Sequence, residues 1–116
     1  MGNGEMNITD KELYDKGFMK YNRTPYQSDG VVCNFQKCYR DPENGNRLFF
    51  LDVHKWDFSS EKIPNIYTYE ITAQLYKKGN HDFFDITFGA DFTVEDVEEF
   101  IYKLFENGMI EPYEKD

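Results

Sequence analysis

The sequence predicts an α+β fold in which a four-stranded antiparallel meander sheet is flanked by an N-terminal and a C-terminal helix. Aromatic residues make up 18% of the chain, with eleven Phe and nine Tyr, and aromatic side chains favour strands. Four segments with alternating polarity follow one another over short connections, which favours antiparallel neighbours. With 116 residues the chain can build one core but not two, so we expect a single domain over 1–116.

The first predicted element is a helix that begins after Thr9. Glu12 follows three residues later and completes a capping box, the usual mark of a helix start. We expect this helix to continue to about Asn22, although Gly17 weakens its interior by about 1 kcal/mol relative to Ala. Pro25 forces the residue before it into an extended conformation, so the segment 22–30 is predicted to be a loop.

Each of the four predicted strands has one recognisable core face. The strands are 31–40, 47–56, 66–76 and 82–88. In the first of them, Cys33 and Cys38 lie on opposite faces and roughly 16 Å apart, so they cannot bridge each other there. Two unpaired cysteines favour a reducing compartment, and we expect a cytoplasmic protein. No apolar run approaches the ~20 residues that cross a bilayer, so no membrane contact is expected.

Two turns set the expected strand registers. A two-residue loop at 79–80 places Leu75 opposite Phe84 and keeps both strands' apolar residues on one face. The earlier turn is predicted to be a three-residue loop over 43–45, because a two-residue loop there would mix the core faces of its strands.

The last predicted helix begins after Thr93, which caps it together with Asp96. It should end at Asn107, because Gly108 can adopt the left-handed conformation that closes a helix. The segment 111–116 is predicted to be a frayed tail. The expected buried stripe is Val97, Phe100, Ile101, Leu104 and Phe105.

The non-core face of the sheet could hold a reactive cluster. The predicted registers place Asn34, His54 and Thr68 in one row and Gln36, Asp52 and Glu70 in the next. Asp52, His54 and Glu70 together would suit a metal ion or an acid/base pair, which makes a small metal-dependent or acid/base enzyme the alternative function. A shift of the strand register by two residues would separate these side chains, and nearby Lys or Arg could neutralise the carboxylates. Either would exclude a metal or acid/base site. Since no catalytic motif accompanies the cluster, we expect no enzyme, no cofactor and no metal ion.

Large aromatic residues also fall on the non-core face. They are Trp56, Phe58, Tyr76 and Phe83. If they are exposed together, they form an apolar patch of the kind that marks an interface, and Trp56 and Tyr76 become candidate binding residues. The alternative is that the N-terminal helix covers this face and buries them in a three-layer core.

The formal charge of −9 lies entirely in the last 35 residues, which contain eleven acidic residues and two basic ones, Lys103 and Lys115. Over residues 1–81 the numbers of acidic and basic residues are equal. Such a surface disfavours direct binding to nucleic acid and favours a basic protein partner. First-turn acids complement the helix dipole, and Glu99 with Lys103 would form an exposed i,i+4 pair, but these account for only part of the charge. The candidate binding residues are Glu95, Glu98, Glu99 and Glu106.

Four stretches, "KYNRTPYQSDGVVCNFQKCY", "DVHKWDFSS", "YEITAQLY" and "ENGMIEPYE", together resemble short acidic proteins encoded by bacterial phages and mobile elements. The resemblance implies a small accessory protein of the bacterial cytoplasm and carries over no functional residues. It also makes an inhibitor of a host nucleic-acid-binding enzyme plausible, because carboxylates on a rigid helix can replace backbone phosphates.

Overall fold

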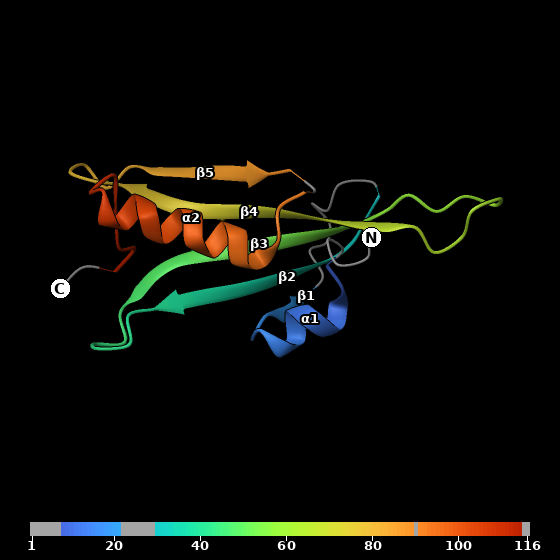
Figure 1. Ribbon diagram of the computed structural model, residues 1–116, viewed down its shortest axis with the longest axis horizontal. Helices are drawn as coiled ribbons and strands as arrows, with labels where there is room; N and C mark the ends of the chain where they lie inside the picture. Colours follow the sequence, from blue (N-terminus) through green and yellow to red (C-terminus); the bar gives the residue numbers. More distant parts are fainter. Residues whose placement is uncertain (1–7, 22–29, 90, 115–116) are drawn as a thin grey trace.

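The computed structural model describes residues 8–21, 30–89 and 91–114, and it has the α+β fold with an antiparallel sheet that the sequence predicts (Figure 1). Both helices lie against one face of the sheet. The strand order is β1-β2-β3-β4-β5, and β6 pairs with β4. Of the predicted loop over 22–30, only the last residue is described. The elements are α1 (Asp10–Asp15), β1 (Met19–Tyr21), β2 (Val31–Arg40), β3 (Arg47–Asp57), β4 (Tyr67–Lys77), β5 (Phe83–Phe88), α2 (Val94–Glu106) and β6 (Ile110–Glu111).

The N-terminal helix is much shorter than predicted. Thr9 caps α1 as expected, but the helix ends after six residues rather than near Asn22. Gly17 has a φ of +94°, and the amide of Phe18 donates to the carbonyl of Leu13 at 2.9 Å, which closes the helix. The glycine that was expected only to weaken the helix therefore ends it, and the chain continues as β1.

The register of β2 with β3 is confirmed at its centre, where Phe35 lies opposite Val53. The predicted three-residue loop is wrong, because the amide of Asp41 donates to the carbonyl of Asn46 at 2.8 Å and leaves the four residues 42–45 outside the ladder. A shift in the pairing near the end of β2 compensates for the extra residue.

The hairpin of β4 and β5 also keeps its predicted register, with Leu75 opposite Phe84. Its turn is longer than the predicted two residues. The amide of Lys77 donates to the carbonyl of Asp82 at 2.8 Å, and His81 adopts a left-handed conformation with a φ of 60°. The strands therefore separate earlier than the turn sequence suggested.

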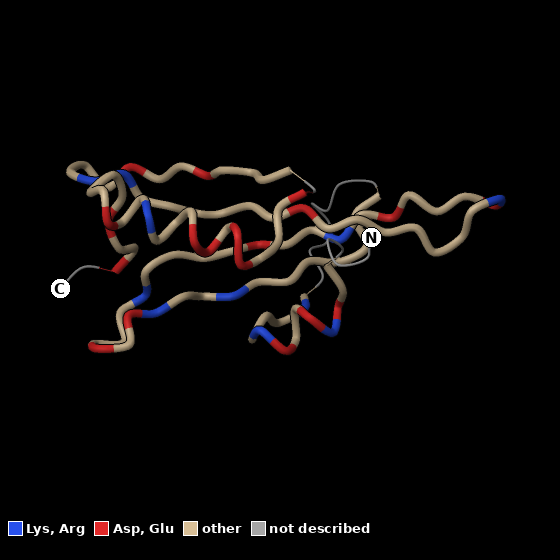
Figure 2. The backbone as a smooth tube through the Cα atoms, viewed as in Figure 1, with Lys and Arg blue, Asp and Glu red and all other residues tan. Residues whose placement is uncertain are grey.

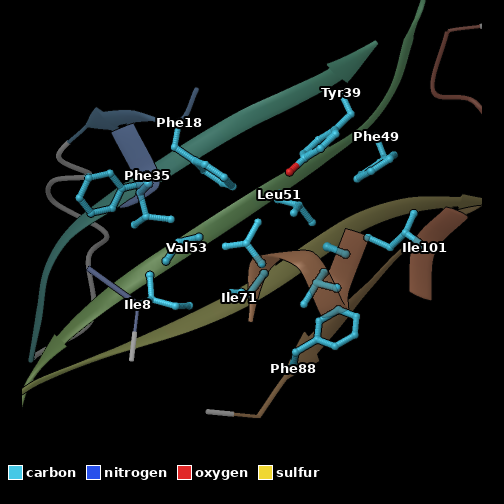
Figure 3. Close-up of a cluster of buried hydrophobic side chains, with 14 of the residues drawn as sticks. Ile8, Phe18, Phe35, Tyr39, Phe49, Leu51, Val53, Ile71, Phe88 and Ile101 are labelled. Carbon is cyan, nitrogen blue, oxygen red and sulfur yellow. The ribbon is translucent and has the colours of Figure 1, made fainter. Parts of the chain in front are cut away.

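The core lies between the sheet and the two helices (Figure 3). Leu51 and Val53 of β3 and Ile71 of β4 are fully or almost fully buried at its centre. On β2 and β3, the rings of Tyr39 and Phe49 stack with their centroids 4.4 Å apart. The helix α1 belongs to this same layer, because Leu13 joins the core and the ring of Tyr14 contacts Phe35.

Helix α2 is fixed at both ends as predicted. The hydroxyl of Thr93 accepts from the amide of Asp96 at 3.1 Å, and the carboxylate of Asp96 accepts from the amide of Thr93 at 3.2 Å. After the helix, Gly108 has a φ of +68° and the amide of Met109 donates to the carbonyl of Leu104 at 3.0 Å. The predicted stripe is partly wrong, since Phe100 is 40% exposed.

The segment after α2 is not the frayed tail that the sequence predicted. Its first residues form β6, and Glu111 lies opposite Tyr76 of β4. The amide of Tyr113 then donates to the carbonyl of Leu48 on β3 at 2.9 Å. The C-terminal segment is thus bonded to both β3 and β4, and its residues 115–116 lie outside the described part of the chain.

Candidate functional site

Four of the predicted binding residues lie on one flank of α2. At about 100° per residue, Glu95, Glu98, Glu99 and Glu106 fall within roughly 100° of the helix circumference, beside the buried stripe. We call these four residues the acidic flank. Figure 2 shows the acidic positions gathered along α2, while Lys and Arg lie mainly on the other elements.

Two members of the acidic flank bind the rest of the fold. Glu95 forms an ion pair with Lys16, which follows α1. Glu98 accepts a hydrogen bond of 2.6 Å from the hydroxyl of Tyr39 on β2. Burial and then this hydrogen bond to a carboxylate raise the pKa of Tyr39, so the tyrosine remains a neutral donor. These contacts hold the flank in a fixed position over the sheet.

The other two members, Glu99 and Glu106, are exposed and have no hydrogen bond or ion pair with any residue that the structure describes. The i,i+4 pair expected between Glu99 and Lys103 is absent from the ion pairs of residues 8–21, 30–89 and 91–114. Two carboxylates on the flank are therefore open to a partner.

Several other acids of the C-terminal region have structural roles that the sequence did not reveal. Glu111 is buried and bonds Nδ1 of His81 at 2.6 Å. Glu114 binds Arg47, and the hydrogen bonds from the Arg47 amide and side chain lower the pKa of the Glu114 carboxyl. The excess of negative charge that is free for a partner is thus smaller than the sequence suggested.

The polar face of the sheet differs from the prediction in the pairing of β3 with β4. His54 lies opposite Glu70 and Asp52 opposite Thr72, whereas the sequence placed His54 beside Thr68 and Asp52 beside Glu70. The connection does close with a tight turn, because the amide of Ser60 donates to the carbonyl of Ile63 at 2.8 Å, but its sequence contains no Asn-Gly or Asp-Gly pair from which the register could be predicted.

Asp52 is 4% exposed, and three donors satisfy it. Its carboxylate accepts from Tyr21 at 2.9 Å and from Gln36 at 3.1 Å, and it also accepts from Gln74. His54 is bonded through Nδ1 to the buried Asn34. In the described part of the chain, no three His, Cys, Asp or Glu residues are placed to share a metal ion. Asp52 and His54 of the predicted cluster are thus bonded to uncharged side chains.

The aromatic residues of this face do not form one patch. Trp56 lies opposite Thr68 and is half-buried, in a hollow of about 320 Å³ that Phe58 also lines. Tyr76 lies near the other end of β4, where its ring stacks on His81 with centroids 4.6 Å apart. The three-layer alternative is also wrong, because α1 packs on the opposite face of the sheet.

Sequence reasoning missed an apolar groove of about 520 Å³ between β5 and α2. Phe83, Phe100 and Met109 line it and are 55%, 40% and 59% exposed. The sequence contained no clear indication of this groove, because Phe83 falls on the non-core side of its strand and Phe100 was assigned to the core.

The fold and this surface define a small α+β protein whose sheet carries both helices on one face and whose second helix presents an acidic flank. No protein-family model, no curated protein and no solved structure matches the chain. Among the described residues, no helix has the length and apolar character needed to span a bilayer.

Proposed function

We propose that this chain is a non-enzymatic protein-binding module that recognises a basic protein through the acidic flank. The observation that carries the proposal is the pair of exposed carboxylates, Glu99 and Glu106, which no described residue neutralises. A basic partner would gain both direct ion pairs and faster association from a chain with a net charge of −9.

The rigidity of α2 makes the acidic flank suitable for recognition. The helix is capped at Thr93, closed at Gly108 and tied to the sheet through Glu98, so its carboxylates do not have to be ordered on binding. From Glu95 to Glu106 the flank extends about 16 Å along the helix axis. Fixed negative charges over this length can replace part of a phosphate backbone in a basic groove.

The partner that suits this surface is therefore a nucleic-acid-binding protein of the bacterial cytoplasm. The resemblance to phage and mobile-element proteins favours a host enzyme that the chain binds and inhibits. Direct binding of nucleic acid to the chain itself is disfavoured by its negative charge.

The test is a pull-down from a nuclease-treated bacterial lysate with the native chain and the Glu99→Gln/Glu106→Gln variant. Glu98 is left unchanged because it binds Tyr39. The matched control is Glu43→Gln/Glu61→Gln, which removes two charges from exposed loops elsewhere. We expect the native chain and the control to recover a basic protein at low salt, high salt to weaken the capture, and double-stranded DNA to displace it.

Equal recovery of the same protein by the Glu99→Gln/Glu106→Gln variant would exclude the acidic flank as the binding site. The hollow beside Trp56 would then be the next surface to test, with Trp56→Ala.

A further inference from the structure

The geometry points to a second binding site, at the free edge of β5, that accepts an extended segment of a partner protein as an additional strand. The segment would alternate apolar and basic residues. This inference rests on the proposed function for the class of partner, a basic protein, but it uses other residues. The acidic flank lies on the side of α2 that faces away from the groove.

The first observation is that β5 forms one edge of the sheet (Figure 1). The amide of Lys77 donates to the carbonyl of Asp82, and bonded pairs alternate along an antiparallel ladder. The amides and carbonyls of Phe83, Asp85 and Thr87 therefore point away from β4. No residue in 8–21, 30–89 or 91–114 pairs with this edge.

The second observation is that the apolar groove lies directly beside this edge. Phe84 and Ile86 of β5 point to the helix side of the sheet and form one wall. Phe100, Leu104 and Met109 form the other wall. A strand added to β5 would direct every second side chain into this groove, so apolar residues are required at those positions.

The third observation is the charge on the opposite face of β5. Asp85 is exposed, and its side chain has no hydrogen bond or ion pair with a described residue. In the added strand, the residues between the apolar ones would stand on this face. A Lys or Arg opposite Asp85 would form a cross-strand pair of opposite charge.

The same residue argues against a second copy of the chain as the occupant. Two two-fold antiparallel pairings align five residues of β5, and the one centred on Asp85 places this residue opposite its own copy, which is unfavourable. Each copy also carries a net charge of −9. A basic segment from another protein is the occupant that both the edge and the charge favour.

The probe for this site is a synthetic peptide of about eight alternating Lys and Val residues, long enough to cover β5. It is titrated into the isotope-labelled full chain while amide shifts and hydrogen exchange are followed. We expect the amides of Phe83, Asp85 and Thr87 to shift and become protected. A matched peptide with Ser in place of Val should bind at least about tenfold more weakly, because it cannot fill the groove.

Two further peptides test strand addition directly. Each is N-methylated at alternate residues, one set on each edge of the extended peptide. One set should abolish binding and the other should leave it intact, because only one edge of a strand faces β5. Equal binding by both methylated peptides, or no shift at β5 with the unmodified peptide, would overturn the inference.

Variants of the chain complete the test. Asp85→Lys should weaken binding of the Lys-Val peptide by about tenfold, whereas Glu43→Lys, with the same change of net charge in a distant turn, should not. The Glu99→Gln/Glu106→Gln variant should bind the peptide normally. Normal peptide binding alongside a failed pull-down would reject the acidic flank alone, and the reverse result would reject the β5 edge alone.

Discussion

The hydroxyl of Tyr39 on β2 donates a 2.6 Å hydrogen bond to the carboxylate of Glu98 on α2, and this contact joins the sheet to the helix that carries the acidic flank. The ring of Tyr39 also stacks on Phe49 in the core. One side chain therefore combines a packing contact with a polar contact, and the two can be separated by substitution.

Tyr39→Phe should lower the free energy of unfolding by about 1 kcal/mol, because it removes the hydrogen bond to Glu98 and keeps the ring. Tyr39→Ala should cost about 3 kcal/mol or more, since it also leaves a cavity beside Phe49. Urea unfolding of the two variants measures the difference. Equal losses would show that the hydroxyl, and not the ring, supplies the stability.

The ionised carboxyl of Asp10 should stabilise the folded chain at neutral pH but not in acid. Burial by itself would raise its pKa, but hydrogen bonds from Tyr69 at 2.6 Å and Lys55 at 3.2 Å outweigh burial and lower it. A carboxyl whose pKa is lower in the folded state than in the unfolded state stabilises the fold at pH values above its unfolded-state pKa. This stabilisation is lost as the pH falls through the folded-state pKa.

Asp10→Asn should therefore be less stable than the native chain at neutral pH, and the difference should shrink as the pH falls below 3.8, the ordinary value for the group. Urea unfolding at several pH values measures this difference, with Glu43→Gln as a control in an exposed turn. A difference that stayed constant across the acid range would contradict the assigned role of Asp10.

The next prediction concerns Asp52, whose hydrogen bonds join β3 to three other strands on the polar face of the sheet. Asp52→Asn replaces one acceptor oxygen with an amide donor, which would face either the donors on Oδ1, Tyr21 and Gln36, or the donor on Oδ2, Gln74, so it should destabilise the fold by about 1–3 kcal/mol. If the metal-dependent form of the alternative function is wrong, Mn²⁺ or Zn²⁺ should leave the Tm of the native chain unchanged. A rise in Tm with metal that is lost in Asp52→Asn would instead favour the metal-dependent alternative.

Local patterns in the sequence predicted the faces of the strands, both helix starts and the registers of the two hairpins, because these depend on neighbouring residues and short turns. Contacts between distant segments could not be predicted in this way. The pairing of His54 with Glu70 follows a connection whose sequence contains no Asn-Gly or Asp-Gly turn, so its register could not be predicted. The buried carboxylate of Glu111 bonds His81, 30 residues earlier in the chain. The acidic flank was predicted in position, but the partners of Glu95 and Glu98 were visible only in the folded chain.

The C-terminal segment provides the last prediction. His81 holds it through two contacts, since Nδ1 bonds the carboxylate of Glu111 at 2.6 Å and Nε2 bonds the carbonyl of Tyr113 at 3.1 Å. His81→Ala removes both contacts, including the 2.6 Å bond to the buried carboxylate of Glu111, so it should destabilise the fold by about 1–3 kcal/mol. It should also release the residues after Gly108, which limited proteolysis followed by mass measurement would detect as early cleavage there.

Asn80→Ala, at the neighbouring turn position, is the matched control. Its side chain accepts a hydrogen bond only from the amide of Asp82 among the described residues, at 3.1 Å, so its loss should not release the C-terminal segment. If His81→Ala were cleaved no faster than Asn80→Ala, the segment would be held mainly by its bonds to β3 and β4. Replacing Arg47, whose side chain binds Glu114, would then be expected to have the larger effect on cleavage.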